Sequence, residues 1–261
     1  MKLPDALRAL VGDLPYTAES IGKSGASVLR FDTMVLKIEP ETDGFFPSVE
    51  MLRWLEGKLP VPRVLYAGQE NGLQYLLMTR IPGKMACDPD YTADPEALAE
   101  MLARALQALW QVDITHCPRQ RRLADDLEEA RYRVAHGLID LADAEPETFC
   151  EGGFESPAQL LQWLQDNQPP LEPVLSHGDL CLPNIFLVGG RLSGFIDLGD
   201  AGISDKWRDI ALCWRSLDHN IRGKYAAHPQ ASFCPDILFE KLGIAPNREK
   251  LRYYILLDEL F

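Results

Sequence analysis

The chain has 261 residues, 46% of them hydrophobic and 25% charged, which is typical of a globular protein. It contains no apolar run of the roughly 18–20 residues that cross a membrane, and its first residues lack the apolar segment of a signal peptide. The six cysteines form no Cys-x-x-Cys pair, a scatter typical of free thiols rather than of a zinc site or a disulfide framework. We therefore expect a cytoplasmic protein with no membrane partner.

The net charge of −13 is distributed unevenly along the chain. Residues 1–83 carry 9 Lys and Arg against 10 Asp and Glu, whereas residues 84–261 carry 17 against 29. This acidity argues against a nucleic-acid partner and would suit a cationic ligand in the C-terminal part. Acidity that only aids solubility explains the same numbers. The sequence is compatible with a monomer.

Residues 1–79 are predicted to form a mostly antiparallel sheet with one inserted helix. Short alternating runs between residues 17 and 39 surround a segment rich in Gly and Ser, and Val35–Ile38 is the clearest strand. The other elements expected here are a short helix at 3–11, a helix at 47–58 and strands at 60–68 and 73–79. The chain breakers of residues 79–84 predict a linker.

After this linker the hydrophobic period becomes helical. Asp94 and Pro95 form the start of a long helix as N-cap and first-turn proline. Further helices are expected at 123–136, 156–166, 205–219, 235–242 and 247–259. We therefore predict an α+β fold with two lobes: a small antiparallel β lobe (1–79) that binds nucleotide, a hinge linker (80–84) and a larger, mainly helical lobe (85–261).

The most informative segment is His177-Gly178-Asp179, followed by Asn184 and then by Asp197. In kinase-type sites one Asp receives the proton of the acceptor hydroxyl, while an Asn five residues later and a second Asp bind magnesium. Apolar runs at 173–176, 185–188 and 193–196 place both ligand candidates at the ends of short strands. Asp179 is thus predicted to be catalytic, with Asn184 and Asp197 as Mg²⁺ ligands. A surface hairpin with an Asp-capped turn would leave this spacing unexplained.

The Gly-Ser segment at 22–27 could approach the phosphates of a nucleotide, with Ser24 and Ser27 as donors. A plain hairpin turn would have the same composition. Lys37 is the only lysine on its apolar strand and suits the α- and β-phosphates, unless it belongs to a solvent-facing strand face.

Two further contacts are expected on the nucleotide side. Glu50, on the helix at 47–58, is the best-placed partner for Lys37, although it could equally be a solvated helix residue. The linker backbone at Arg80 and Ile81 would meet the edge of the base.

These motifs resemble those of the aminoglycoside 3′-phosphotransferases. The resemblance rests on HGDLCLPN at 177–184, GFIDLG at 194–199 and DKWRDIA at 205–211, with the C-terminal YYILLDELF at 253–261 as its most discriminating part. WLEGKLPVP at 54–62 is also similar. The resemblance implies a eukaryotic-protein-kinase-like fold. It also implies transfer of the γ-phosphate of ATP or GTP, with Mg²⁺, to the 3′-hydroxyl of kanamycin- or neomycin-type antibiotics.

The resemblance also implies how a polycationic aminoglycoside is held. The side chains of Asp258 and Glu259 and the carboxylate of Phe261 would bind its amines, together with the acidic segment before His177. In that segment, residues 140–155, we expect Glu147 and Glu151 to contact the substrate. A solvated flexible loop would have the same composition.

The chain departs from the family pattern in two places. Asp200 follows Gly199 where the family commonly has arginine, and Glu50 is out of the usual register relative to Trp54. Two other functions therefore stay open. One is a kinase of a different small amino-alcohol or amino-sugar, such as choline or fructosamine. The other is a nucleotide- or cation-binding module without turnover.

Overall fold

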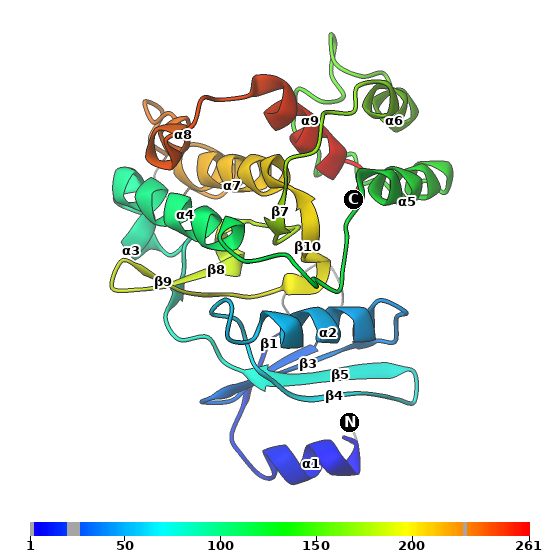
Figure 1. Ribbon diagram of the computed structural model, residues 1–261, viewed down its shortest axis with the longest axis vertical. Helices are drawn as coiled ribbons and strands as arrows, with labels where there is room; N and C mark the ends of the chain where they lie inside the picture. Colours follow the sequence, from blue (N-terminus) through cyan, green and yellow to red (C-terminus); the bar gives the residue numbers. More distant parts are fainter. Residues whose placement is uncertain (1–2, 20–26, 227–228) are drawn as a thin grey trace.

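A five-stranded antiparallel sheet with two helices forms the first part of the chain in the computed structural model, which describes residues 3–19, 27–226 and 229–261 (Figure 1). The strand order is β1-β2-β3-β5-β4. Its elements are α1 (Asp5–Val11), β1 (Thr17–Glu19), β2 (Ser27–Arg30), β3 (Met34–Pro40), α2 (Phe45–Leu55), β4 (Val64–Glu70) and β5 (Leu73–Thr79).

The alternation of β3 decides which way Lys37 points. Leu36 and Ile38 are buried in a cluster that includes Leu7 and Val11 of α1, so this face of the sheet is covered by α1. Because successive side chains of a strand point to opposite faces, Lys37 lies on the other face. That face looks toward α2 and the rest of the molecule (Figure 1).

The chain leaves the five-stranded sheet at Thr79 and enters the second part at β6, which pairs with β8. This part is mainly helical, with two small sheets ordered β6-β8-β9 and β10-β7. Its elements are β6 (Lys84–Met85), α3 (Pro89–Thr92), α4 (Pro95–Trp110), α5 (Leu123–Ala135), α6 (Pro157–Asp166), β7 (Pro173–Ser176), the 3-10 turn η1 (Leu182–Asn184), β8 (Ile185–Val188), β9 (Arg191–Phe195), the 3-10 turn η2 (Leu198–Asp200), β10 (Gly202–Asp205), α7 (Lys206–Ile221), α8 (Ile237–Leu242) and α9 (Arg248–Asp258).

The core of the second part lies between α4, α7 and α9. The predicted apolar face of α4, including Leu98, Leu102 and Leu109, is fully buried, and α4 packs against α7 and α8. Helix α7 in turn packs against α9. The loop after β7 and the turn after β9 therefore rest on this core, on the side that faces the first part of the chain, and the turn after β9 contacts α2 (Figure 1).

The predicted elements are present, with differences at their ends. The expected strand at 60–68 begins only at Val64, because Pro60 and Pro62 cannot donate ladder hydrogen bonds. The helix expected at 47–58 begins at Phe45 and ends at Leu55. Strand β10 was not predicted; its pairing with β7 depends on residues that are distant in sequence.

Two chain-wide observations concern membranes and thiols. Within the described ranges, no helix combines the length and apolarity needed to span a bilayer. All six cysteines fall inside these ranges and are free thiols.

Candidate active site

Asp179 lies just after β7, on a loop whose geometry depends on glycine. Gly178 has a φ of +90°, a conformation that residues with a Cβ rarely adopt. The Asp179 carboxylate accepts a hydrogen bond from Asn184 Nδ2 at 3.0 Å, and the same amide nitrogen donates to the Asp179 carbonyl at 2.9 Å. Desolvation by the surrounding protein raises the pKa of Asp179, and repulsion from Asp258 and Asp197 adds to the effect. A carboxylate with a raised pKa is a better proton acceptor.

Asp209, a residue of α7 that was not predicted to be part of the site, holds this loop in place. Its side chain is fully buried. One carboxylate oxygen accepts from Ser176 Oγ at 3.0 Å and Gly178 N at 3.1 Å, and the other accepts from His177 N at 2.8 Å. The available signal was an aspartate followed directly by the apolar residues Ile210 and Ala211 on a helix.

His177 shapes the loop and does not face the cavity. Its ring is buried, Nε2 lies 2.9 Å from the Ile196 carbonyl, and Nδ1 accepts a hydrogen bond from Asp179 N at 3.3 Å. Since both ring nitrogens are engaged by backbone groups, Asp179 is the group left to receive a proton.

Asn184 directly precedes β8 and Asp197 lies just after β9, so both are at the open end of this hairpin. They are held close together because Ile196 N donates to the Asn184 carbonyl at 3.0 Å. With its nitrogen donating to Asp179, the Asn184 amide is left with its oxygen as a ligand atom. An amide oxygen and a carboxylate fit Mg²⁺, which prefers oxygen ligands. Mg²⁺ usually takes only a few of its ligands from the protein and keeps several water molecules. Over the described ranges, no group of three or more His, Cys, Asp or Glu could form a larger metal cage.

Lys37 reaches across from the sheet to Asp197, one of the two candidate metal ligands. Its ammonium lies 3.4 Å from an Asp197 carboxylate oxygen and 3.0 Å from Glu39. Desolvation alone would lower the pKa of Lys37, but the two carboxylates outweigh it and raise the pKa. The expected pairing with Glu50 is wrong for this structure: Glu50 lies on the exposed side of α2, whereas Glu39 shares a strand face with Lys37.

The other residues predicted to bind the nucleotide differ in how exposed they are, and one of them lies outside the described residues. Ser24 lies outside the described residues, and Ser27 is exposed at the start of β2. Ile81 is buried in the connection after β5. The backbone N–H of Arg80 already donates to the Thr33 carbonyl, so a base at this point would use other backbone groups.

A cavity of about 450 Å³ opens beside Asp179. Asp258, Glu259 and Phe261, the C-terminal residues expected to bind substrate, line it. Glu147 and Glu151 do not: they are exposed and lie outside its lining. The acidic segment instead contributes Asp140, Asp143 and Glu145. The chain turns away after Glu145, because Thr148 is buried and accepts a hydrogen bond from Phe154 N.

Basic side chains from α7 and the following turn contact the acids of this cavity. Arg215 contacts Asp258, His219 lies 3.0 Å from Glu145, and Lys224 lies 2.7 Å from Asp143. Sequence reasoning missed these basic residues. The only available signal was the i, i+4 spacing of Arg215 and His219, which puts both on one helix face. Six acidic side chains against one Lys and one Arg still leave the lining strongly negative.

Comparisons with known proteins show the family of the chain. The phosphotransferase enzyme family matches residues 22–248. The chain belongs to this family. An aminoglycoside 3′-phosphotransferase of Niallia circulans is 36% identical over 99% of this chain and 97% of its own length. This phosphotransferase also resembles the crystal structure of an aminoglycoside 3′-phosphotransferase of type VIII, with 31% identity, 98% coverage of each chain and a TM-score of 0.79.

A third relative was solved with ligands. An aminoglycoside phosphotransferase from Streptomyces rimosus, in complex with ADP and streptomycin, has a TM-score of 0.80 and 26% identity, covering 97% of this chain and 95% of its own. The predicted α+β fold of the protein-kinase-like type is thereby confirmed for this phosphotransferase, as is its assignment as a kinase with a nucleotide phosphate donor.

Proposed function

We propose that this phosphotransferase moves the γ-phosphate of ATP or GTP to the 3′-hydroxyl of kanamycin- or neomycin-type aminoglycosides and so confers resistance to them. The observation that carries the proposal is the position of Asp179 on the wall of a cavity lined by six acidic side chains. A polyamine placed there by its charges would bring hydroxyl groups to the catalytic carboxylate. The relatives described above support the choice of acceptor.

The residues divide the reaction between them. Asp179 orients the acceptor hydroxyl and receives its proton, aided by its raised pKa. Lys37 neutralises phosphate charge, and Asn184 and Asp197 supply the oxygen ligands for magnesium. Bound Mg²⁺ would withdraw charge from the phosphate oxygens. Asp209 and His177 keep the loop in shape while the reaction proceeds.

The lining favours a polyamine over choline. A quaternary ammonium group is best recognised by a cage of aromatic rings. The aromatic lining residues found in the described chain are Tyr225 and Phe261, whereas the carboxylates are spread along the cavity. Such a spread suits a ligand with several separated amines.

Transfer can be tested directly with purified protein. ATP or GTP with Mg²⁺ and kanamycin should give a monophosphorylated product, whereas an otherwise similar aminoglycoside without a 3′-hydroxyl should give none. Bacteria expressing the chain should show the same pattern of resistance. Product from the 3′-deoxy compound would overturn the regiochemistry, and turnover with choline or fructosamine alone would overturn the substrate class.

Glu259 makes substrate affinity depend on pH. Burial raises its pKa to about 7. Its charged form, which attracts amines, therefore develops only as the pH rises through neutrality, and the aminoglycoside KM should fall between about pH 6 and pH 8. Loss of protons from the drug itself acts in the opposite direction. The wild-type KM divided by that of Glu259→Gln isolates the residue, and a ratio independent of pH would contradict its role.

The same group should affect stability with the opposite sign. Between pH 4.5, its ordinary pKa, and about 7, the folded chain keeps a proton on Glu259 that the unfolded chain has lost. The contribution of Glu259 to the free energy of unfolding therefore declines as the pH rises through this window.

The organisation of the chain completes the proposal. Residues 1–79 would act as the nucleotide lobe, 80–84 as the hinge and 85–261 as the lobe that binds the aminoglycoside. The free thiols and the use of a nucleoside triphosphate favour the cytoplasm as the place of action.

A further inference from the structure

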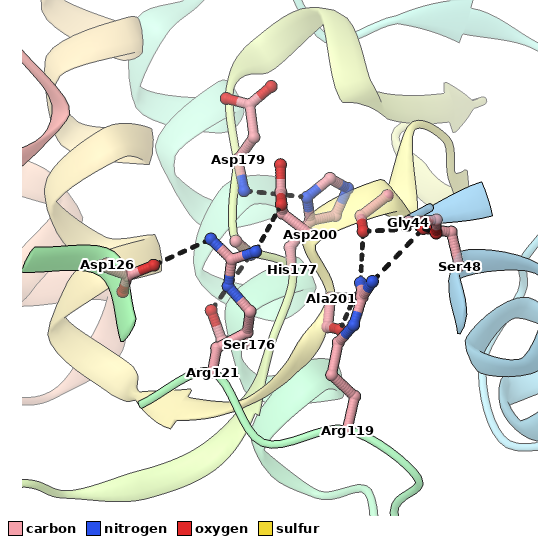
Figure 2. A network of polar contacts seen from close by, with 12 residues as sticks. Gly44, Ser48, Arg119, Arg121, Asp126, Ser176, His177, Asp179, Asp200 and Ala201 are labelled. Atoms are coloured by element: carbon pink, nitrogen blue, oxygen red, sulfur yellow. Dashed lines mark hydrogen bonds and ion pairs between the residues drawn. The ribbon is translucent and has the colours of Figure 1, made fainter. Parts of the chain in front are cut away.

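Asp200, which stands where the family commonly has arginine, is the end of a chain of ion pairs (Figure 2). Its carboxylate lies 2.8 Å from Arg121, and the other end of the Arg121 guanidinium lies 2.8 Å from Asp126. Asp126 in turn contacts Arg208 at 2.5 Å. Arg208 Nε donates to the Gly178 carbonyl at 3.1 Å.

This chain of contacts joins two catalytic loops. Asp200 ends the short turn η2 that begins one residue after Asp197, and Gly178 is the neighbour of Asp179. The loops also touch directly: a Cβ built on Gly178 would lie 2.5 Å from the Asp200 carbonyl oxygen. Any shift of Asp200 relative to Gly178 would therefore move the metal-binding residue relative to the proton acceptor.

The positive and negative charges in this series of ion pairs are equal in number. Two guanidinium groups, of Arg121 and Arg208, face two carboxylates, of Asp126 and Asp200. The side chain of Asp126 is only 3% exposed and that of Arg208 only 11%, so the inner members have little water to replace a lost partner. An arginine at position 200 would place three cations around a single carboxylate.

The backbone places Arg121 at this position. The segment before α5 runs beside β10, with Ile203 N donating to the Arg119 carbonyl and Arg121 N donating to the Ile203 carbonyl. Arg119, two residues from Arg121, uses the same pairing to reach the Gly199 carbonyl and lies 3.4 Å from Ser48 of α2 (Figure 2). Two arginines of one segment thus hold both sides of the turn that follows Asp197.

We propose that Asp200 and Arg121 are a positioning pair that keeps the metal-binding Asp197 in register with the catalytic Asp179. In this chain Asp200 supplies the acidic partner that Arg121 faces at this position. The inference rests on the proposed function for the acceptor, but not for the nucleotide or the metal.

The test compares three substitutions at one position. Asp200→Asn should lower kcat about tenfold, as expected from a small misplacement of reacting groups, and raise the Mg²⁺ concentration for half-maximal activity, with little change in aminoglycoside KM. Asp200→Glu should recover most of the loss. Asp200→Arg, which restores the residue of the family, should be the worst of the three because it repels Arg121.

Two controls separate positioning from folding. Asp125→Asn removes an exposed ion pair with Arg122 at the start of α5, the helix that carries Asp126. This variant should change neither kcat nor the Mg²⁺ dependence. Each kcat is divided by the fraction of protein that binds ADP at saturating ADP and Mg²⁺, so that unfolded material does not count and a change in affinity does not enter. A drop in unfolding temperature with an unchanged corrected kcat would overturn the proposal, as would an Asp200→Arg variant as active as wild type.

A double-mutant cycle tests whether the two residues act together. If Arg121→Gln and Asp200→Asn remove the same contact, the double variant should be no slower than the slower single variant; additive losses would overturn the pairing. Mg²⁺-dependent affinity for ADP, measured without an acceptor, should follow the same order. This readout stays valid if the acceptor turns out not to be an aminoglycoside, so the two proposals fail separately.

Discussion

Replacing Asp179 by asparagine should abolish phosphate transfer and leave nucleotide affinity nearly unchanged. Asparagine keeps the size of the side chain and can still accept a hydrogen bond from Asn184 through its amide oxygen. It cannot receive the proton of the acceptor hydroxyl. General-base groups contribute roughly 10²–10⁴-fold, so we expect kcat to fall by about 10³-fold.

Steady-state turnover and a titration with ADP and Mg²⁺ measure the two quantities. Asp179→Ala should be at least as inactive. Asp166→Asn, which changes an exposed acid on α6, is the matched control and should behave as wild type. If Asp179→Asn kept substantial turnover, another group would have to receive the proton; weak nucleotide binding would mean that Asp179 also positions the phosphates.

Asp209→Asn should cause a large loss of stability and should also impair catalysis. Both carboxylate oxygens accept hydrogen bonds from buried donors, so an amide nitrogen at either position would face an N–H or O–H group. Hydrogen bonds to a charged group contribute about 1.5–3 kcal/mol each, and a buried donor left unpaired adds a penalty. We expect the free energy of unfolding to fall by about 3 kcal/mol.

Urea unfolding of the wild type, Asp209→Asn and Asp218→Asn measures this loss. Asp218 lies on the same helix but pairs with Arg222 at the surface, where an ion pair contributes at most about 1 kcal/mol. A similar loss for both variants would show that the buried contacts of Asp209 are not special. The folded fraction of Asp209→Asn should also have a lowered kcat, because the loop that carries Asp179 loses its support.

The core of the site was predictable because its geometry is local. Asn184 follows Asp179 by five residues and bonds back to it across one short turn, so spacing alone specifies the contact. Asp197 follows a tight hairpin whose two strands fix its distance from Asn184. The apolar faces of α4 and of β3 likewise follow from residue periodicity, which places Lys37 on the sheet face toward the site.

The residues of the proposed substrate side could not be predicted one by one. The acidic segment 140–155 has no period, so its composition indicated a cation site but not which carboxylates face the cavity. Glu145 is turned inward because its N–H donates to Glu259, directly after α9, and its carboxylate contacts His219 of α7. Glu147 lies beyond these contacts. Which carboxylates face the cavity depends on how α7 and α9 pack together, and this packing cannot be predicted from the sequence of the segment alone.

Sequence by itself thus predicted the α+β fold and the kinase assignment of this phosphotransferase, and it singled out Asp179, Asn184 and Asp197 as candidates for the catalytic and metal-binding roles. Only the tertiary structure decided the partners. Lys37 pairs with Glu39 and Asp197 rather than with Glu50, and Asp200 meets Arg121 from a segment about eighty residues away. Local motifs are specified by short-range backbone geometry, whereas ion pairs between distant segments exist only after the core has brought those segments together.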